Sequence, residues 1–314
     1  MAPAHAPFDP VVAKAEAEGV HAAELAALRR RLRQLGEHGA GLLPGEVLAP
    51  VADLPCLDEL PEPPPSRARE VLDRLVVVKL NGGLGTSMGL AGPKSLLEVK
   101  PGASFLDVIA TQVLALRARH GAQLPLMLMN SAATRGHSLE ALRHYDSLPV
   151  PGVPLDFLQG REPKLRAADL QPVAWPAAPE LEWCPPGHGD IYPALAASGV
   201  LDVLLGAGLR YAFVSNSDNL GALADVRIAA WIAAPSADSS WITGVLSGSR
   251  GSTVLRLTIS GRSGAAGSAA CRSLSARRSI QMLLVLYQRQ RSTSVNEVSP
   301  SGTCAVSRST TRPW

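Results

Sequence analysis

The chain alternates short apolar runs with longer segments in which apolar residues recur every three or four positions. A short apolar run bounded by turn residues is typical of a buried strand. Four runs fit this description, at residues 76–78, 126–129, 155–158 and 211–214. The longer spacing predicts helices with one buried face, at residues 11–35, 105–121, 138–145 and 191–205. The alternation predicts an α/β fold with a mainly parallel or mixed sheet and helices on both faces.

Single residues mark the ends of several predicted elements. Ser104 can accept hydrogen bonds from the first turn of the helix that follows it, and Gly121 can end that helix in the left-handed conformation. Gly199 predicts a break within residues 191–205. The prolines of residues 55–65 cannot continue a helix, so they predict an extended connector after an N-terminal helical arm.

Residues 75–95, LVVVKLNGGLGTSMGLAGPKS, run from a predicted strand that ends at Val78 into a glycine-rich loop. Bare amides in such a loop can donate hydrogen bonds to phosphate oxygens, and Lys94 offers a positive charge to the same anion. The loop departs from the Walker A pattern because Pro93 separates glycine from lysine. We interpret it as an anion-binding loop. The alternatives are a structural turn for the glycines and a salt bridge for Lys94.

Polar residues follow two further predicted strands. Gln159 comes after residues 155–158, and the sequence Ser-Asn-Ser-Asp-Asn comes after residues 211–214. In α/β sheets, ligands bind at the carboxyl ends of the strands, so we expect these residues at the same edge as the glycine-rich loop. Asp218 has the oxygen chemistry that Mg²⁺ prefers, which predicts a metal ligand. An Asx turn that only closes the strand is the alternative.

A third motif is the loop WCPPGHGD at residues 183–190, which presents His188 between two glycines. Two prolines stiffen this loop and the glycines permit close approach, as a planar or sugar ligand requires. On chemistry alone, a lone loop histidine is more often a surface residue than a functional one. By the same criterion, Gln159 is interpreted as an ordinary exposed glutamine. Arg161 and Lys164 lie nearby and read as surface charge.

These motifs, NGGLGTSMG, GPKS, FLQ, PPGHGD and NSDN, resemble those of the UTP:glucose-1-phosphate uridylyltransferases, also called UDP-glucose pyrophosphorylases. The resemblance covers residues from about 10 to 234. It implies a Rossmann-like nucleotide-diphospho-sugar transferase fold, incomplete at the C-terminus, and Mg²⁺ as cofactor. The implied reaction joins UTP and glucose 1-phosphate into UDP-glucose and pyrophosphate. Residues 75–234 would then be a partial nucleotide-binding catalytic domain, preceded by a helical arm at 1–54 and a Pro-rich connector and lead-in at 55–74.

The resemblance also assigns roles to individual residues. It implies that UTP is contacted by Leu80, Asn81, Gly82, Gly83, Lys94, Gln159, Gly187 and Asp218. It implies that the sugar phosphate is contacted by Gly82, Gly83, His188, Asn216, Ser217 and Asp218. It further implies that Lys94 has the catalytic role of stabilising charge on the triphosphate, that Gln159 recognises uracil, and that Asp218 binds the metal. His188 would lie by the sugar phosphate, and we do not expect it to act as a general base.

Charge and composition change at residue 235. Residues 235–314 contain ten arginines, no lysine and only Asp238 and Glu297 as acids, for a net charge of +8, whereas residues 1–234 carry −5. This Ser/Arg-rich tail matches no motif of the family, and its apolar runs at 254–259 and 280–287 are not expected to join a common core. A shifted reading frame, truncation or disorder would explain the tail. The alternative is a basic tail that binds nucleic acid, which composition alone supports only weakly.

Other features narrow the class of protein. The N-terminus lacks the basic and apolar regions of a secretory signal, and no apolar run approaches the length of a membrane span. Four widely spaced cysteines form no Cys-x-x-Cys pair, which favours a reducing cytoplasm. We expect the arginines of residues 29–33 to form a solvated helix face, and the alternative is that they face an acidic partner.

Two other functions stay open at this point. The first is a truncated, inactive module that binds UTP or a UDP-sugar. The second is a pyrophosphorylase for another sugar 1-phosphate. Enzymes for N-acetylhexosamine phosphates usually carry Ala and an Arg-Leu pair where this chain has Asn81 and Ser87-Met88. The pattern leaves the oligomeric state undetermined.

Overall fold

The structure, a computed structural model, describes residues 8–38, 57–85, 92–234, 252–260 and 279–287. Its centre is a six-stranded sheet in the order β5-β4-β1-β8-β10-β9. The strands are β1 (Leu75–Asn81), β4 (Leu126–Asn130), β5 (Asp156–Leu158), β8 (Tyr211–Asn216), β9 (Ser252–Ser260) and β10 (Ser279–Tyr287). All neighbouring pairs are parallel except β10 and β9, so the prediction of a mainly parallel or mixed sheet is confirmed.

Several of these strands differ from their predicted ends or roles. Strand β1 continues to Asn81 instead of ending at Val78, because Lys79 is buried and bonded within the protein. Strands β9 and β10 extend the sheet beyond β8, although residues 254–259 and 280–287 were not expected to join the core. The open edge of β8 provides the backbone hydrogen bonds that β10 uses. The remainder of the Ser/Arg-rich tail lies outside the described residues.

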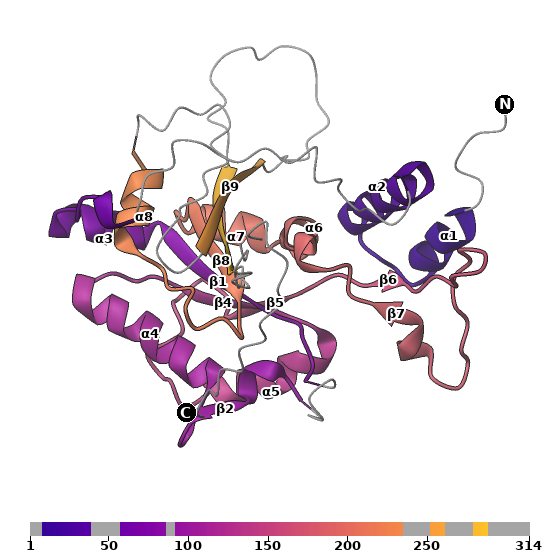
Figure 1. Ribbon diagram of the computed structural model, residues 1–314, viewed down its shortest axis with the longest axis horizontal. Helices are drawn as coiled ribbons and strands as arrows, with labels where there is room; N and C mark the ends of the chain where they lie inside the picture. Colours follow the sequence, from indigo (N-terminus) through magenta and orange to yellow (C-terminus); the bar gives the residue numbers. More distant parts are fainter. Residues whose placement is uncertain (1–7, 39–56, 86–91, 235–251, 261–278, 288–314) are drawn as a thin grey trace, which may run out of the picture.

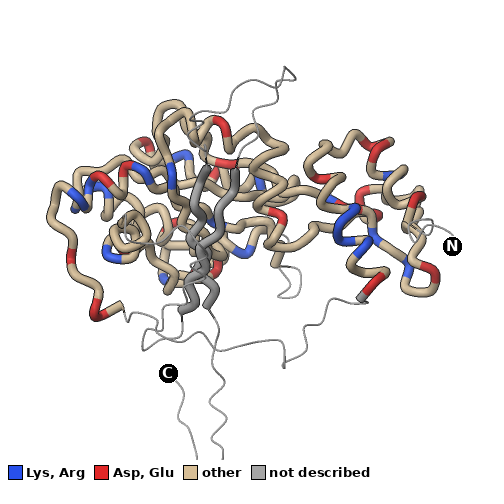
Figure 2. Tube along the Cα trace, turned by 90° about the horizontal axis from the view of Figure 1, so that it is seen from above, with Lys and Arg blue, Asp and Glu red and all other residues tan. Residues whose placement is uncertain are grey.

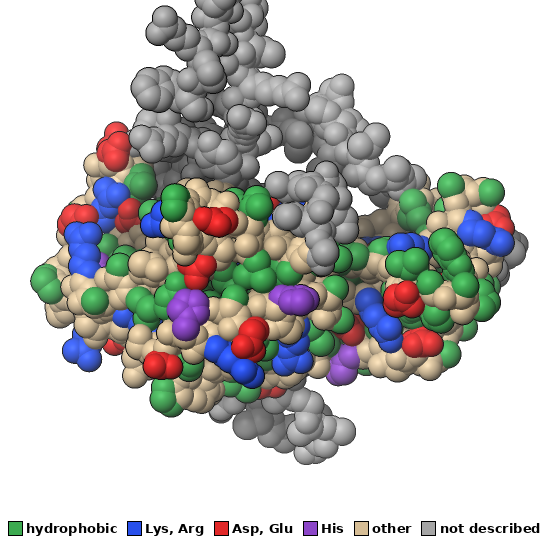
Figure 3. Space-filling model, turned by 90° about the horizontal axis from the view of Figure 1, so that it is seen from below, with side chains coloured by type: hydrophobic (Ala, Val, Ile, Leu, Met, Phe, Trp, Pro, Cys, Tyr) green, Lys and Arg blue, Asp and Glu red, His purple; other side chains and the backbone are tan. Residues whose placement is uncertain are grey.

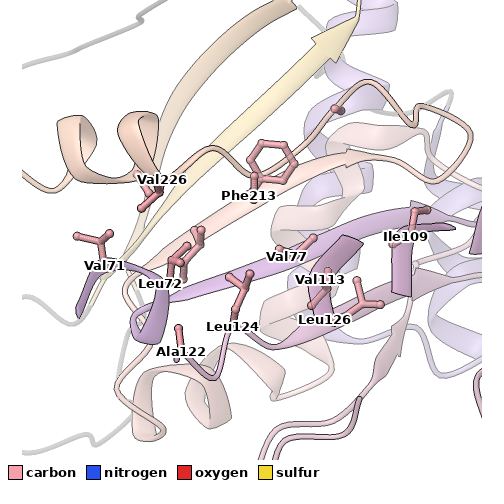
Figure 4. Close-up of a cluster of buried hydrophobic side chains, with 14 of the residues drawn as sticks. Val71, Leu72, Val77, Ile109, Val113, Ala122, Leu124, Leu126, Phe213 and Val226 are labelled. Carbon is pink, nitrogen blue, oxygen red and sulfur yellow. The ribbon is translucent and has the colours of Figure 1, made fainter. Parts of the chain in front are cut away.

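Alternate residues of β1 point to opposite faces of the sheet, and each face is buried under helices. Leu75 and Val77 join a cluster built with α3 (Pro65–Asp73), α4 (Phe105–His120) and α8 (Val226–Ile232). Figure 4 shows Phe213 and Val77 at the centre of this cluster. Val76 and Val78 join a second cluster with α6 (Ile191–Ala197) and α7 (Val200–Gly206). The layers are visible in Figure 1, where α4 and α5 (Ala132–Leu142) lie on one side of the sheet and α6 and α7 on the other.

The ends of α4 follow from the sequence as predicted. Ser104 caps the helix by accepting from Asp107 N, and the Asp107 side chain accepts from Ser104 N in return. Gly121 ends the helix with φ 62°. The next helix, α5, begins at Ala132 rather than at residue 138, because Ser131 and Thr134 form a second reciprocal cap. Helices α6 and α7 are separated at Gly199, where φ is 72°, as the sequence predicts.

The prediction for the N-terminal arm is wrong in one respect, because residues 11–35 form two helices rather than one. Helix α1 (Asp9–Ala17) ends near Gly19, whose φ of 69° is left-handed, and α2 (Ala22–His38) folds back on it. Val11 and Ala15 of α1 pack against Leu28 and Leu32 of α2. A reversal of this kind buries the apolar stripe of each helix on the other, which a single straight helix would leave exposed.

The arm lies beside a hairpin of β6 (Glu162–Pro163) and β7 (Trp183–Cys184), to one side of the sheet (Figure 1). Figure 2 shows basic residues gathered in this part of the molecule, where α2 carries Arg29, Arg30, Arg31 and Arg33. One of them, Arg31, donates two hydrogen bonds to Glu162 of the hairpin. The favoured prediction of a solvated arginine face is therefore wrong for Arg31, because its side chain pairs with Glu162 of the same chain.

The remaining elements are short. Residues 61–64 have no regular structure, as expected for the proline run, and α3 begins at Pro65, the last proline of that run. The others are the two strands β2 (Glu98–Lys100) and β3 (Ala103–Ser104) and the 3-10 helices η3 (Leu57–Glu59), η5 (Lys94–Leu96), η6 (Pro179–Glu182) and η7 (His188–Asp190). On the face shown in Figure 3, acidic and basic side chains are interspersed.

Within the described ranges, no helix by itself is long and apolar enough to cross a membrane. Residues His188–Ala197 and Val200–Gly206, which are bent by 75°, pass that test as a pair by length and composition alone.

Candidate functional site

The carboxyl ends of four parallel strands meet at one edge of the sheet. The register pairs Asn81 of β1 with Asn130 of β4, Asn130 with Leu158 of β5, and Leu80 with Asn216 of β8. The glycine-rich loop, Gln159 and the Asp218 segment leave the sheet from these strands. The structure therefore brings together three of the predicted motifs at the edge where ligands bind in α/β folds.

Gln159 lies directly against Gly82. A Cβ atom added to Gly82 would lie 2.6 Å from Cδ and 2.7 Å from Nε2 of Gln159, closer than real Cβ contacts. Gly82 is thus required for the present position of this amide, a requirement that the sequence pattern did not predict. The predicted uracil-reading residue and the start of the glycine-rich loop form one surface.

Lys94 lies beside the same loop. The loop closes like a hairpin, because Lys94 N donates to Gly83 O at 3.2 Å and Gly85 N donates to Gly92 O at 3.0 Å. The Lys94 side chain passes Gly83, with Cδ 3.9 Å from the position of an added Cβ. In the described part of the chain Lys94 forms no ion pair within 4.0 Å, so its predicted alternative role in a salt bridge finds no partner there. Residues 86–91 of the loop lie outside the described residues.

The side chains of Leu80 and Asn81 are buried inside the protein. Asn81 is buried, and its Nδ2 donates to Asn130 Oδ1 at 2.7 Å and to Ser138 Oγ at 2.8 Å. Leu80 is buried in the cluster under α6 and α7, and its carbonyl accepts from Ser217 N at 3.1 Å. A contact between these residues and UTP stays a prediction for their backbone only.

The network behind Asn81 contains residues that the sequence patterns did not single out. Asn130 Nδ2 donates to Asp156 Oδ2 at 3.2 Å, and Arg135 forms an ion pair with Asp156 at 2.8 Å. Asn130 directly follows the predicted strand 126–129, so its place as a polar residue at a strand end was the available signal. This network fixes the end of β1 from which the glycine-rich loop departs.

Lys79 was also missed as a structural residue, and it holds the opposite side of β1. Its Nζ donates to Ser215 Oγ at 2.7 Å and to Ala222 O at 3.1 Å, so it ties together the two ends of the segment that carries Asp218. Only 2% of Lys79 is exposed. Burial lowers its pKa from 10.5 to about 8.

Asp218 is exposed at the end of β8, beside Ser217, which is buried, and Asn216, whose Oδ1 is buried without a hydrogen-bond partner among the described residues. No group of three or more His, Cys, Asp or Glu side chains that could hold a metal occurs in the described ranges. One carboxylate fits Mg²⁺ when water and substrate phosphates supply its other ligands, as is usual for this ion. The donor chemistry at Asp218 therefore fits the predicted metal.

The loop before α6 places Gly187 and His188 at the surface. Gly187 has φ 101° and ψ 178°, a conformation that essentially only glycine adopts, and its carbonyl accepts from Asp190 N at 3.0 Å. His188 is exposed and begins the short helix η7. The nearby cation Arg161 stacks 4.5 Å from the Trp183 ring and pairs with Glu18 at 3.3 Å, which gives it a structural role.

Comparison with known proteins agrees with this geometry. The family model described as UTP–glucose-1-phosphate uridylyltransferase matches residues 41–242. The potato (Solanum tuberosum) protein of that name is 44% identical over 184 residues, which are 58% of this chain and 37% of the relative. The probable UTP–glucose-1-phosphate uridylyltransferase of Schizosaccharomyces pombe is 43% identical over 162 residues, which are 51% of this chain and 32% of the relative.

Solved structures show the same relationship. UDP-glucose pyrophosphorylase from Leishmania major matches with a TM-score of 0.67 and 34% identity, covering 89% of this chain and 57% of that one. A mutant of that enzyme in complex with UDP-glucose matches with a TM-score of 0.68. The chain thus spans about a third of the length of the curated relatives it matches. Since the family model covers most of the chain, from the lead-in through all the predicted motifs, this protein belongs to the UTP–glucose-1-phosphate uridylyltransferase family.

Proposed function

We propose that this chain binds UTP at the edge of its sheet and takes part in the formation of UDP-glucose and pyrophosphate from UTP and glucose 1-phosphate. The observation that carries the proposal is the joint surface of Gly82 and Gln159, with Lys94 beside the adjoining Gly83. An amide that reads the uracil edge and a cation for phosphate thus flank one glycine-rich loop. Family membership and the UDP-glucose complex of the Leishmania relative support the same ligand.

The proposed reaction is an in-line displacement at phosphorus. A phosphate oxygen of glucose 1-phosphate forms a bond to the α-phosphorus of UTP, and the bond from that phosphorus to the bridging oxygen breaks. Pyrophosphate leaves with the electron pair. Lys94 offsets charge on the triphosphate, while Gly82 and Gly83 let the backbone approach the nucleotide. His188, Asn216 and Ser217 contact the sugar phosphate in this proposal and take no proton.

The proposed cofactor is Mg²⁺, held by Asp218 and by substrate phosphates. When bound, it would neutralise charge on the phosphates and help align them. The carboxylate of Asp218 is exposed at the edge of the sheet, as a ligand to a phosphate-bound metal requires. We place the protein in the cytoplasm, on the basis of its widely spaced cysteines.

The alternative function is nucleotide binding without turnover. The same residues would then hold UTP or UDP-glucose with no chemical step.

A paired experiment separates the two functions. Pyrophosphate release is measured with UTP, glucose 1-phosphate and Mg²⁺, and UTP binding is measured by calorimetry on the same preparation. We expect UTP binding, and turnover at ordinary enzyme rates would exclude the binding-only function. Replacing glucose 1-phosphate by N-acetylglucosamine 1-phosphate tests the sugar. Absence of UTP binding in a folded protein would contradict both functions.

A further inference from the structure

Asp190 joins two segments that reach the site from different parts of the chain. Its Oδ2 accepts a hydrogen bond from Gly160 N at 2.5 Å, and its own N–H donates to Gly187 O at 3.0 Å. Gly160 directly follows Gln159, and Gly187 directly precedes His188. One residue therefore connects the amide proposed to recognise uracil with the loop whose Gly187 is expected to contact UTP.

Asp190 is unusually placed for a carboxylate. Only 2% of it is exposed, and its Oδ1 has no hydrogen-bond partner among the described residues. Burial raises its pKa, the Gly160 N–H and Arg31 oppose that shift, and Glu24 and Glu162 add to it. A buried carboxylate with one unpaired oxygen is costly to keep, so its bond to Gly160 is a specific feature rather than incidental surface contact.

Helix α2 also brings a carboxylate, that of Glu24, close to the Gly160 backbone. A Cβ atom added to Gly160 would lie 2.7 Å from Asp190 Oδ2 and 2.8 Å from Glu24 Oε1, so carboxylates of the loop and the arm surround the Gly160 backbone. Arg31 of α2 donates to Glu162 through Nε at 2.9 Å and through its terminal nitrogen at 2.7 Å. The arm thus packs against the segment that carries Gln159.

We propose that Asp190 is a positioning residue for uridine recognition, which fixes Gln159 relative to the Gly187 loop, and that helix α2 supports this arrangement through Glu24 and Arg31. The inference rests on the proposed function, since it concerns how the same site selects its base. It gives the N-terminal arm a part in base selection, although the arm contains none of the residues proposed to contact UTP.

The physical basis is the directionality of an amide. Uracil presents an N–H donor next to carbonyl acceptors, whereas cytosine presents an acceptor next to an amino donor, so one orientation of the Gln159 amide suits only one of them. A site that holds the amide firmly leaves buried polar groups unpaired with the wrong base. If Gly160 is released, Gln159 can turn to suit either base, and discrimination falls while phosphate binding persists.

The test compares UTP with CTP by calorimetry on the whole chain. Wild-type protein is expected to bind UTP more tightly than CTP. The variant Asp190→Ala is expected to weaken UTP binding by about tenfold, as the loss of a hydrogen bond to a charged group typically does, whereas CTP binding should stay the same or become tighter because the freed amide can turn to suit cytosine. Asp190→Asn keeps a carbonyl oxygen that accepts from Gly160 N–H, so it is expected to retain most of the discrimination.

Gly160→Ala gives an independent test, also where Asp190→Ala does not fold. The added methyl group displaces the Asp190 and Glu24 carboxylates without changing either residue, and it is expected to reduce the ratio of UTP to CTP affinity in the same way. Gly136→Ala is the matched control, because a Cβ there contacts nothing within 4 Å, and its ratio should equal that of wild type.

The outcomes separate the two proposals. Wild-type protein that fails to prefer UTP would contradict the proposed function and, with it, the role of Asp190. Wild-type protein that prefers UTP, together with a folded Asp190→Ala or Gly160→Ala variant of unchanged preference, would overturn only the role of Asp190.

Discussion

At the scale of single residues, the importance of a residue in the site depends on which side chain or backbone group it contacts. Gly82 matters because Gln159 occupies the space that a side chain would need. Lys79 matters because Ser215 and Ala222 receive its ammonium group on either side of the Asp218 segment. Neither role can be read from the residue type, because each depends on a partner that is distant in sequence.

We predict that Gly82→Ala lowers UTP affinity without unfolding the protein. The added methyl group must displace the end of the Gln159 side chain, which is flexible, so the free energy of unfolding should change little. Loss of the amide contact to uracil is expected to weaken binding by about tenfold. Calorimetry with UTP and thermal denaturation measure the two effects. Gly136→Ala serves as control, and a Gly82→Ala protein with wild-type affinity would contradict the proposed contact.

We predict that burial of Lys79 makes the free energy of unfolding depend on pH. Its pKa is lowered from 10.5 to about 8 in the folded protein, so between these values the unfolded chain binds more protons than the folded one. The free energy of unfolding therefore gains a contribution that rises with pH across that window, by about 3 kcal/mol in total. The comparison with Lys79→Met isolates it, because other titrating groups cancel in the difference.

The measurement is urea denaturation of both proteins at several pH values from neutral to about 10. The stability of wild type relative to Lys79→Met should increase as the pH rises. Parallel pH profiles for the two proteins would show that burial of Lys79 does not perturb its titration.

At the scale of elements, the ends of α4 show how far the sequence determines local structure. Ser104 and Gly121 were both predicted to end this helix, and both do so through local hydrogen bonds and backbone conformation. The N-terminal arm was predicted less well, because Gly19 alone does not reveal whether a helix bends or reverses. That outcome depends on the packing of Val11 against the second helix.

We predict that Ser104→Ala destabilises the protein by about 1 kcal/mol. It removes the side chain that accepts from Asp107 N and leaves a first-turn donor of α4 without its cap. Urea denaturation monitored by circular dichroism measures the loss. Ser131→Ala, at the equivalent cap of α5, should cost a similar amount. No loss of stability in either variant would indicate that water replaces the caps at no cost.

At the scale of the whole molecule, the candidate site was predicted more completely than the contacts that support it. Gln159, Gly82 and Lys94 converge as the order of strands and loops implied, because parallel strands bring their carboxyl ends to one edge. The inward orientation of Asn81 was not predicted, since its partners Asn130 and Ser138 come from other elements. The docking of the arm depends on pairs such as Arg31 and Glu162, which no local pattern specifies.

We predict that Arg31→Ala loosens the arm while leaving the sheet intact. Arg31 and Glu162 connect the arm to the hairpin of β6 and β7, and both side chains are partly buried. Their loss should increase amide hydrogen exchange in α1 and α2, with little change in β1 and β4. Arg29→Ala is the control, because Arg29 pairs with Glu16 inside the arm. Equal exchange in the two variants would show that the pair between Arg31 and Glu162 does not hold the arm.

The strand order has a consequence for how specificity can change. From β1 the chain proceeds outward to β4 and β5 on one side and returns to β8 on the other, so β1 lies at a topological switch point. In the proposed function, the base is read from the β5 side, through Gln159, and the sugar from the β8 side, through Asn216 and Ser217. Base preference and sugar preference are then separable traits. Substitutions that alter one should combine additively with substitutions that alter the other, which would allow the two preferences to evolve, or be engineered, independently.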